Sequence, residues 1–467
     1  MDSIGRRLLE QGAITEIQLE MGLKRQRLMG GRLGSNLMAL GYIKDEELDH
    51  VFQKVPSEPK SFEDTGLEYM QIEGLILKHL LVLGEFMLAD VVDRVKLPHF
   101  LVENVLETLK KEQLVVVKGA SSYTSMSYVY SITDTGRTKA AQAFDLCRYV
   151  GPMPVSLAEY TKMVELQTVK SIVVGESEVK KALSHLVLSE NNIRRLGPAI
   201  SSGQAMFIHG PPGNGKSAIA EAIGSILPDS IYLPYAITVG GQIVNVYDPI
   251  SHIRIQESSN DATSDQRWLK VRRPVVITGG EMTLRMLDLD FNPISKYYEA
   301  SLQMKANNGL LIIDDFGRQQ VDPHQILNRW IVPLDRRLDY LTLHTGMKFT
   351  IPFDMLLIFA TNIEPKKLVD EAFLRRIRYK IKIDCPTEEE FHDIFKKVCV
   401  PYGITFCEKS YAFLLEQYYH KHNFAFSACH PRDLVDHIVN YSSYFNKPPE
   451  MNEETINFAC ENYFINN

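Results

Sequence analysis

The segment FIHGPPGNGKSAIAEAIG, residues 207–224, constrains the fold of this 467-residue chain more than any other. It satisfies the pattern G-x-x-x-x-G-K-[ST] and lies between an apolar stretch typical of a buried strand and a stretch with helical periodicity. The glycines let backbone N–H groups turn inward around phosphate oxygens, and the following helix N-terminus adds its dipole. The segment therefore predicts an α/β domain with a phosphate-binding loop, made of Gly210, Pro211, Pro212, Gly213, Asn214, Gly215, Lys216, Ser217 and Ala218.

A second motif supplies the acids that such a loop needs. In GLLIIDDFG, Asp314 and Asp315 end an apolar strand about one hundred residues after the loop. We expect Lys216 to neutralise the β- and γ-phosphates, and Ser217 and Asp314 to hold Mg²⁺. Asp315 would then orient the attacking water. The same two aspartates could instead cap the next helix.

From about residue 157, apolar strands alternate with helical stretches, the pattern of a parallel sheet covered on both faces. Beyond Pro386 the pattern becomes helical and predicts a smaller lid. FATN places Asn362 at the tip of the last apolar strand. The later segment AFLRRIR contains two adjacent arginines. The helical part contains HPRDLVDHI. We expect the strands at 205–209, 230–236, 275–278, 310–314 and 355–361.

The ordered set GPPGNGKS, LLIIDD, FATN, FLRRI and HPRDL resembles an AAA+ ATPase. The resemblance implies an α/β nucleotide-binding domain over 157–385 and a helical lid over 386–467. It also implies a homo-oligomeric ring, commonly a hexamer, with ATP bound between neighbours. On this basis Asn362 is sensor 1 and Arg432 is sensor 2. Arg376, or else Arg375, is an arginine finger that acts on the nucleotide of the next subunit. SIVVGESEVKKAL resembles the segment that lines the adenine pocket, with Val173 and Val174 as contacts.

Two features modify that resemblance. AAA+ proteins usually have glutamate where this chain has Asp315, and the shorter side chain predicts slower hydrolysis. LTLHTGMKFTIPF, residues 341–353, predicts a hairpin just before the Asn362 strand, as in the MoxR-type clade with a pre-sensor-1 hairpin. A simple edge hairpin would have the same pattern. AITVGGQIVNVYDP predicts a second, Gly-Gly hairpin, which faces the ring pore or forms a surface insertion.

Residues 67–147 have the pattern of a winged helix. Helical stretches surround a Leu-Pro break at 97–98, and two strand-like stretches with a Gly/Ser-rich turn follow. Helix-turn-helix units read DNA with their second helix. Here that helix carries Glu103, Glu107 and Glu112 against Lys110 and Lys111, and it has no arginine to read base edges. We therefore favour protein docking over nucleic-acid binding for this domain.

Residues 1–55 contain an internal duplication with a spacing of 29, since Gly5, Gly12 and Ile14 precede Gly34, Gly41 and Ile43 by that interval. A repeat implies two equivalent helical units packed on each other. The segment resembles the amino-terminal MshEN-type domain of type II secretion and type IV pilus ATPases. That resemblance implies cyclic di-GMP binding by RLG-type motifs, although each copy departs from the pattern, and the alternative is a docking module. The candidate residues are Arg6, Arg7, Arg32, Leu33 and Gly34.

Composition limits the remaining classes. The net charge of −7 provides no general attraction to nucleic acid or anionic membrane, and no stretch reaches the roughly 18 apolar residues of a membrane span. None of the six cysteines forms a CxxC pair, so we expect reduced thiols in a cytoplasmic protein. Pro- and Ser-containing runs at 55–66 and 151–156 predict linkers.

Together these features predict an ATPase with ATP and Mg²⁺ as cofactors that remodels a protein partner bound through residues 1–150, peripheral to an inner-membrane secretion or pilus machine. Two alternatives remain at this point. One is a binding module gated by ATP or cyclic di-GMP with little turnover. The other is a DNA-remodelling ATPase, because AAA+ domains and winged helices also occur together there.

Overall fold

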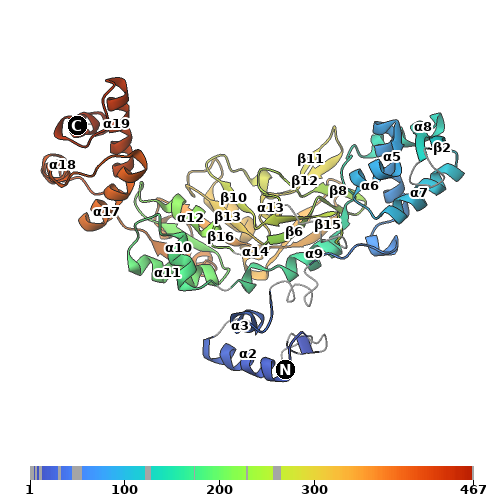
Figure 1. Cartoon of the computed structure of the whole chain (residues 1–467), viewed down its shortest axis with the longest axis horizontal. Helices are drawn as coiled ribbons and strands as arrows, with labels where there is room; N and C mark the ends of the chain where they lie inside the picture. Colours follow the sequence, from blue (N-terminus) through green and yellow to red (C-terminus); the bar gives the residue numbers. More distant parts are fainter. Residues whose placement is uncertain are drawn as a thin grey trace.

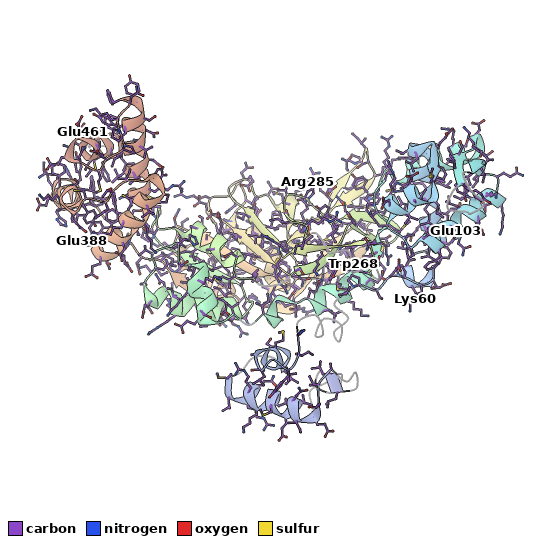
Figure 2. All side chains as sticks on the ribbon, viewed as in Figure 1. Lys60, Glu103, Trp268, Arg285, Glu388 and Glu461 are labelled. Carbon is purple, nitrogen blue, oxygen red and sulfur yellow. The ribbon has the colours of Figure 1, made fainter. Side chains whose placement is uncertain are left out.

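The computed structural model describes residues 5, 8–9, 13–29, 33–44, 55–120, 128–172, 174–227, 230–255 and 264–464. Figure 1 shows an elongated chain with an α/β body in the middle, a helical C-terminal unit at one end and a second helix-rich unit at the other. Glu388 and Glu461 lie on the C-terminal unit, and Glu103 lies at the opposite end (Figure 2). The predictions made for Arg6, Arg7, Arg32 and Val173 concern positions outside the described residues.

The body is built on a five-stranded parallel sheet in the order β10-β13-β16-β5-β17. Its strands are β5 (Met206–His209), β10 (Val275–Thr278), β13 (Leu310–Ile313), β16 (Leu356–Thr361) and β17 (Tyr379–Lys382). All residues of β13 and β16 are buried, as expected when helices cover both faces of a parallel sheet. The predicted α/β fold is confirmed.

Alternate residues of each strand supply two cores, because successive side chains point to opposite faces of a sheet. Met206 and Ile208 pack with α11 (Glu190–Ser201) and α12 (Lys216–Gly224). Phe207 packs on the other face with Trp330 of α14 (Pro323–Arg336). The loop that precedes α12 is therefore held between a buried strand and a buried helix.

One predicted strand belongs elsewhere. The segment 230–236 was expected in the parallel sheet, and this prediction was wrong. β6 (Ser230–Pro234) pairs in antiparallel fashion with β9 (Trp268–Arg272), and the chain then enters a second sheet in the order β11-β12-β8-β7-β4. An apolar run indicates a strand, but its pairing partner lies far away in the sequence. The second sheet contains β4 (Val155–Ser156), β7 (Ala236–Val239), β8 (Gln242–Asn245), β11 (Asp290–Asn292) and β12 (Tyr297–Glu299).

Both predicted hairpins are confirmed, and their turns contact each other. β7 and β8 are joined through Gly240 and Gly241, whose φ values of 54° and 78° suit glycine. β14 (Leu338–Thr342) pairs with β15 (Lys348–Pro352) directly before β16. A Cβ on Gly240 would lie 2.5 Å from the sulfur of Met347 in the second turn. The hairpin that precedes the Asn362 strand thus packs on the inserted second sheet.

The helix-rich unit contains the helices and the two strands predicted for a winged helix, in the predicted order, together with the short strand β1 (Glu85–Met87), which was not predicted. A three-stranded sheet in the order β1-β3-β2 packs against the helices, and α7 buries Leu101, Val105 and Leu109 on one face. The elements in chain order are α5 (Tyr69–Leu83), β1 (Glu85–Met87), α6 (Leu88–Val95), α7 (His99–Lys111), β2 (Val115–Ala120), β3 (Tyr128–Ile132) and α8 (Asp134–Leu146).

The two predicted linkers are ordered connections, which corrects the prediction. Within 151–156, β4 pairs with β7 and Val155 is fully buried. Within 55–66, Ser57 bridges to Ser264, and the carbonyl of buried Thr65 accepts a hydrogen bond of 2.9 Å from Arg267 Nη1. Proline and serine weaken helix propensity, but they do not prevent a chain from adding an edge strand to a sheet.

The N-terminal unit preserves its sequence repeat in three dimensions. Helices α2 (Glu16–Met29) and α3 (Leu33–Ala39) pack around buried Leu8, Ile14, Leu33, Leu37 and Ile43. The pairs Leu8/Leu37 and Ile14/Ile43 are each 29 residues apart. The same hydrogen bond recurs in both copies, from Ala13 N to Leu8 O at 3.0 Å and from Tyr42 N to Leu37 O at 3.0 Å.

The C-terminal unit has its own core, made entirely of residues from 391 to 464. It contains α17 (Glu388–Cys399), α18 (Glu408–Leu414), α19 (His430–Tyr444) and α20 (Glu453–Tyr463). In the described part of the chain, no helix combines the length and the apolar character needed to cross a membrane.

Candidate nucleotide-binding site

The predicted phosphate loop joins β5 to α12, and two of its glycines occupy positions that a side chain would obstruct. Gly210 has φ 150°, and a Cβ there would lie 1.9 Å from the carbonyl oxygen of Ile383 on the neighbouring strand connection. Gly213 has φ 77°, and its Cβ would lie 2.4 Å from Ser427 Oγ. The left-handed φ and the close approach together require glycine at Gly213. The loop is thus tightly packed between the sheet and the lid.

The basic and acidic residues predicted around phosphate come together at the end of β13. Lys216 is buried at 7% exposure, and its Nζ donates to the carbonyl of Pro211 at 2.8 Å. Burial lowers the pKa of Lys216, and the nearby carboxylates of Asp315 and Asp314 partly offset this effect. Ser217 Oγ donates to Asp314 Oδ2 at 2.6 Å. Hydroxyl and carboxylate oxygens are suitable ligands for Mg²⁺, which binds through few protein groups and completes its shell with phosphate and water.

Across the described residues, no group of three or more His, Cys, Asp or Glu side chains could hold an ion by itself. A site for free Zn²⁺ or Ca²⁺ would need such a group.

Asp315 and Asn362 also lie within hydrogen-bonding distance. Asn362 Nδ2, just beyond the tip of β16, donates to Asp315 Oδ1 at 3.1 Å. Asp315 has φ 47°, a left-handed conformation that few residues other than glycine adopt. Its backbone N–H donates to Asp314 Oδ1 at 2.9 Å. The two acids, the hydroxyl of Ser217 and the amide of Asn362 thus form one polar edge beside the loop.

Gln319 holds this edge in place and was not predicted from the sequence. Its Nε2 donates to the carbonyl oxygens of Asp314 at 2.9 Å and Asp315 at 3.2 Å, and its Oε1 accepts from Gly317 N at 2.7 Å. A strained residue keeps its conformation only when its surroundings fix it. Gln319 supplies three of the bonds that fix the turn around Asp315.

The lid contacts the loop directly. Cys429 N donates to Gly213 O at 2.8 Å, and Ala428 N donates to Asn214 Oδ1 at 3.1 Å. Arg432 follows in the first turn of α19 and lines a cavity of about 330 Å³ together with Gly213 and Gly215. The predicted sensor 2 arginine therefore lies at the same cavity as the loop.

The apolar wall of this cavity comes from a segment that the sequence did not identify. Leu186, Val187 and Leu188 line it, with Ile219 from α12 and Ile394 and Val398 from α17. Lys397 of α17 donates to the carbonyl oxygens of Ser184 at 3.0 Å and Leu186 at 3.2 Å, which ties the lid to this wall. Val174, expected beside the base, lines a different cavity next to α11, where its carbonyl accepts from Ser201 Oγ at 3.1 Å.

The two candidate finger arginines lie away from this cavity. Arg376 Nε donates to Asp335 Oδ2 at 2.8 Å at the end of α14. Arg375 is exposed and lines a separate cavity of about 690 Å³ with Lys366, Lys380 and Lys382. The structure therefore brings together the predicted loop, acid and sensor residues. The two candidate finger arginines and Val174 lie elsewhere.

The residues proposed for cyclic di-GMP are not on an accessible surface where the structure describes them. Leu33 is 1% exposed and belongs to the core of the repeat, and Gly34 is buried beside it. Leu33 packs against the backbone of the first copy, since a Cβ on Gly5 would lie 3.3 Å from its Cδ2. No surface of Leu33 remains for a guanine to stack on.

Comparison with known proteins adds little beyond this geometry. A family described as "Domain of unknown function (DUF8689)" matches residues 387–462, which fall within the C-terminal helical unit. No curated protein matches the chain. The Thermotoga maritima RuvB Holliday junction branch migration motor is 14% identical, with 63% of this chain and 71% of that chain covered and a TM-score of 0.33. NtrX from Brucella abortus in complex with ADP is 14% identical, with 60% and 56% covered and a TM-score of 0.37. The strand order of the parallel sheet and the geometry of the loop after β5 define the fold.

Proposed function

We propose that this protein is an AAA+-type ATPase that binds ATP with Mg²⁺ and hydrolyses it. One observation carries the proposal: Ser217 and Asp314 meet at 2.6 Å and Asn362 and Asp315 meet at 3.1 Å, on the same edge of the sheet as the phosphate loop. Such a convergence of a glycine loop, two acids and an amide is what phosphoryl transfer to water requires. A structural cap would use one aspartate and would leave the other groups unrelated.

Each residue then has a role that follows from its position. Lys216 and the loop N–H groups bind the β- and γ-phosphates, and Ser217 and Asp314 hold Mg²⁺, which neutralises charge on those phosphates when bound. Asp315 and Asn362 orient the attacking water. Arg432 places the lid over the nucleotide. Leu186, Val187 and Leu188 form the apolar wall for the base, in place of the expected Val174.

The catalytic arginine acts from a neighbouring copy in a ring. Of the two candidates, Arg375 fits this role better than Arg376, because Arg376 is bonded to Asp335 within its own chain. Arg375 is exposed in a cavity lined by three lysines and two acids, Glu364 and Glu371, and the excess of positive charge there suits the triphosphate of a neighbour. The acceleration from such a finger is on the order of a thousandfold or more. A hexamer is the ring size that the AAA+ resemblance implies.

We further propose that the ring remodels a protein partner held by residues 1–150, at the cytoplasmic side of an inner-membrane secretion or type IV pilus machine. The support is the repeat of residues 1–55 and the winged-helix order of residues 69–146. α7 carries no excess of positive charge, because Glu103 and Glu107 balance Lys110 and Lys111, and this disfavours DNA as that partner.

The test is steady-state ATP turnover of the purified chain over a range of protein concentrations, with Lys216→Ala as the blank. Turnover should rise steeply with concentration and vanish in the blank. Arg375→Ala should remove most of it, while Arg376→Ala should remove less. A mixture of Arg375→Ala and Lys216→Ala chains should recover activity, because an intact finger then meets an intact loop. Tight ATP binding without turnover at any concentration would contradict the motor and favour an ATP-gated switch.

A further inference from the structure

Helix α2 of the N-terminal unit has one face packed and the opposite face uncovered. Gly22 faces α3, and a Cβ there would lie 2.6 Å from Leu37 Cδ2. On the opposite side, Ile17 is 75% exposed, Met21 is 46% exposed and Leu28 is 77% exposed. Three large apolar side chains along one exposed stripe are costly in water unless another surface covers them.

The spacing of the stripe is that of a helix seam. Ile17, Met21, Lys24 and Leu28 follow intervals of four, three and four residues, the a/d pattern that lets two helices pack side by side. Glu20 and Arg27 flank the stripe on the same side, seven residues apart, and both are exposed. The first half of this flank is therefore acidic and the second half is basic.

We propose that α2 pairs with α2 of a second copy of this chain, in antiparallel orientation. In that arrangement Ile17 packs on Leu28 of the second copy, and Lys24 lies over Met21 of the second copy. Antiparallel helices bring matching flanks together, so Glu20 faces Arg27 of the second copy twice in each pair. A parallel pair would instead place the two Lys24 ammonium groups against each other in the seam, and like charges there oppose pairing.

This contact differs from the interface of the proposed ring and does not depend on ATP hydrolysis. Ring neighbours meet through two different surfaces, whereas the α2 pair uses the same surface on both copies and is twofold symmetric. The pair can therefore join two subunits within a ring or one ring to another. It gives residues 1–44 a partner of defined chemistry that is already present in the protein.

A charge exchange tests the pairing and its orientation together, using the full chain without nucleotide in sedimentation experiments. Glu20→Arg gives chains with two basic flank positions, and Arg27→Glu gives chains with two acidic ones. Each variant alone should associate about tenfold more weakly than the wild type, since two attractive contacts per pair become repulsive. An equimolar mixture should recover wild-type association. A mixture that associates no better than its components would overturn the proposal.

Cross-linking provides a second test that tolerates weak affinity. Under mild oxidation, the full-length Ile17→Cys/Leu28→Cys double variant should form an interchain disulfide, above the level set by the wild-type cysteines. Neither single variant should do so. Cross-linking by the single variants would indicate a parallel pair and contradict the orientation. Ile17→Glu should abolish association, whereas Met70→Glu, at a position that is 80% exposed on α5, should not. Association unaffected by Ile17→Glu would assign the stripe to a different protein and overturn the proposal.

Discussion

The winged-helix unit and the lid are both joined to the α/β body, but by different kinds of contact. The winged-helix core extends into the inserted sheet, where it includes Ala236, Ile243 and Tyr297. The lid core contains no residue of the body, and the hydrogen bonds that hold the lid run to the phosphate loop and the cavity wall. One joint is apolar and distant from the nucleotide, and the other is polar and touches the nucleotide site. We therefore expect a nucleotide bound at the loop to act on the lid first and the winged helix to stay fixed to the body.

Buried Arg267 adds a polar anchor beside the apolar joint, because it binds the two segments that connect the winged-helix unit to the rest of the chain. At 1% exposure it pairs with buried Asp265 at 2.8 Å, and it also donates to the carbonyls of Thr65 and Pro154. Arg267→Leu should lower the free energy of unfolding by about 3–5 kcal/mol, because it leaves Asp265 unpaired inside the protein. Urea denaturation measures the change. Arg285→Leu, which breaks the exposed ion pair with Asp290, should cost less than about 1 kcal/mol. Equal losses in the two variants would contradict the special role of Arg267.

Gly213 is the corresponding point of the polar joint. Gly213→Ala adds a Cβ where Ser427 Oγ and Cys429 Sγ lie at 2.4 and 2.6 Å. The lid must then move off the loop, and we expect ATP affinity to fall about ten- to hundredfold, which corresponds to roughly 1.4–2.7 kcal/mol. Calorimetric titration with ATP measures this loss. Gly346→Ala is the matched control, because Gly346 has a similar φ of 85° but nothing within 4 Å of its Cβ position. A similar loss in the control would show that backbone strain and not lid contact is responsible.

Lys397 tests the second contact of the lid. Lys397→Met keeps most of the length of the side chain but removes the bonds to Ser184 and Leu186. Because these bonds are near the surface, we expect only about a fivefold loss of ATP affinity, roughly 1 kcal/mol. Lys396→Met, which disrupts a pair with exposed Glu408, should leave affinity unchanged. Unaltered binding in Lys397→Met would mean that the apolar wall is positioned without the lid.

Acid should weaken the apolar joint through His79. This buried side chain lies 2.9 Å from Gly151 O through Nε2, its Nδ1 has no partner in the described structure, and burial lowers its pKa. The unfolded chain then binds a proton near pH 6.5 that the folded protein binds only at lower pH. The contribution of His79 is therefore complete above about pH 6.5 and is lost as pH falls below it.

Urea denaturation at several pH values would detect this loss. The pKa values of His252 and His430 are lowered as well, so both also contribute to the pH dependence of the unfolding free energy. The relevant quantity is therefore the difference in that pH dependence between a variant and the wild type. His79→Gln should reduce the dependence of unfolding free energy on pH, while substitution of exposed His324 by Gln should not. An unchanged slope in His79→Gln would exclude the histidine as a source of the effect.

Local chemistry made much of the site predictable from the sequence. A phosphate loop needs glycines, a lysine and a hydroxyl at fixed spacing, and the acids and Asn362 must follow buried strands. Gln319 could not be found this way, since nothing local distinguishes it from exposed Gln320. Leu186–Leu188 and Val174 occur in two similarly apolar stretches of sequence. Which stretch faces the cavity beside the phosphate loop depends on where the lid packs. The pairing of 230–236 and 151–156 likewise depends on strands distant in the sequence.

The backbone at Asp315 gives a reason for the identity of that residue. At φ 47° a short Asp or Asn is tolerated because its side chain can bond locally, whereas a longer side chain adds strain. The aspartate at this position therefore suits the turn that Gln319 fixes, and its shorter reach is a consequence. We therefore expect that Asp315→Glu alone would not raise turnover, because the longer side chain would strain the turn that places the carboxylate beside Asn362.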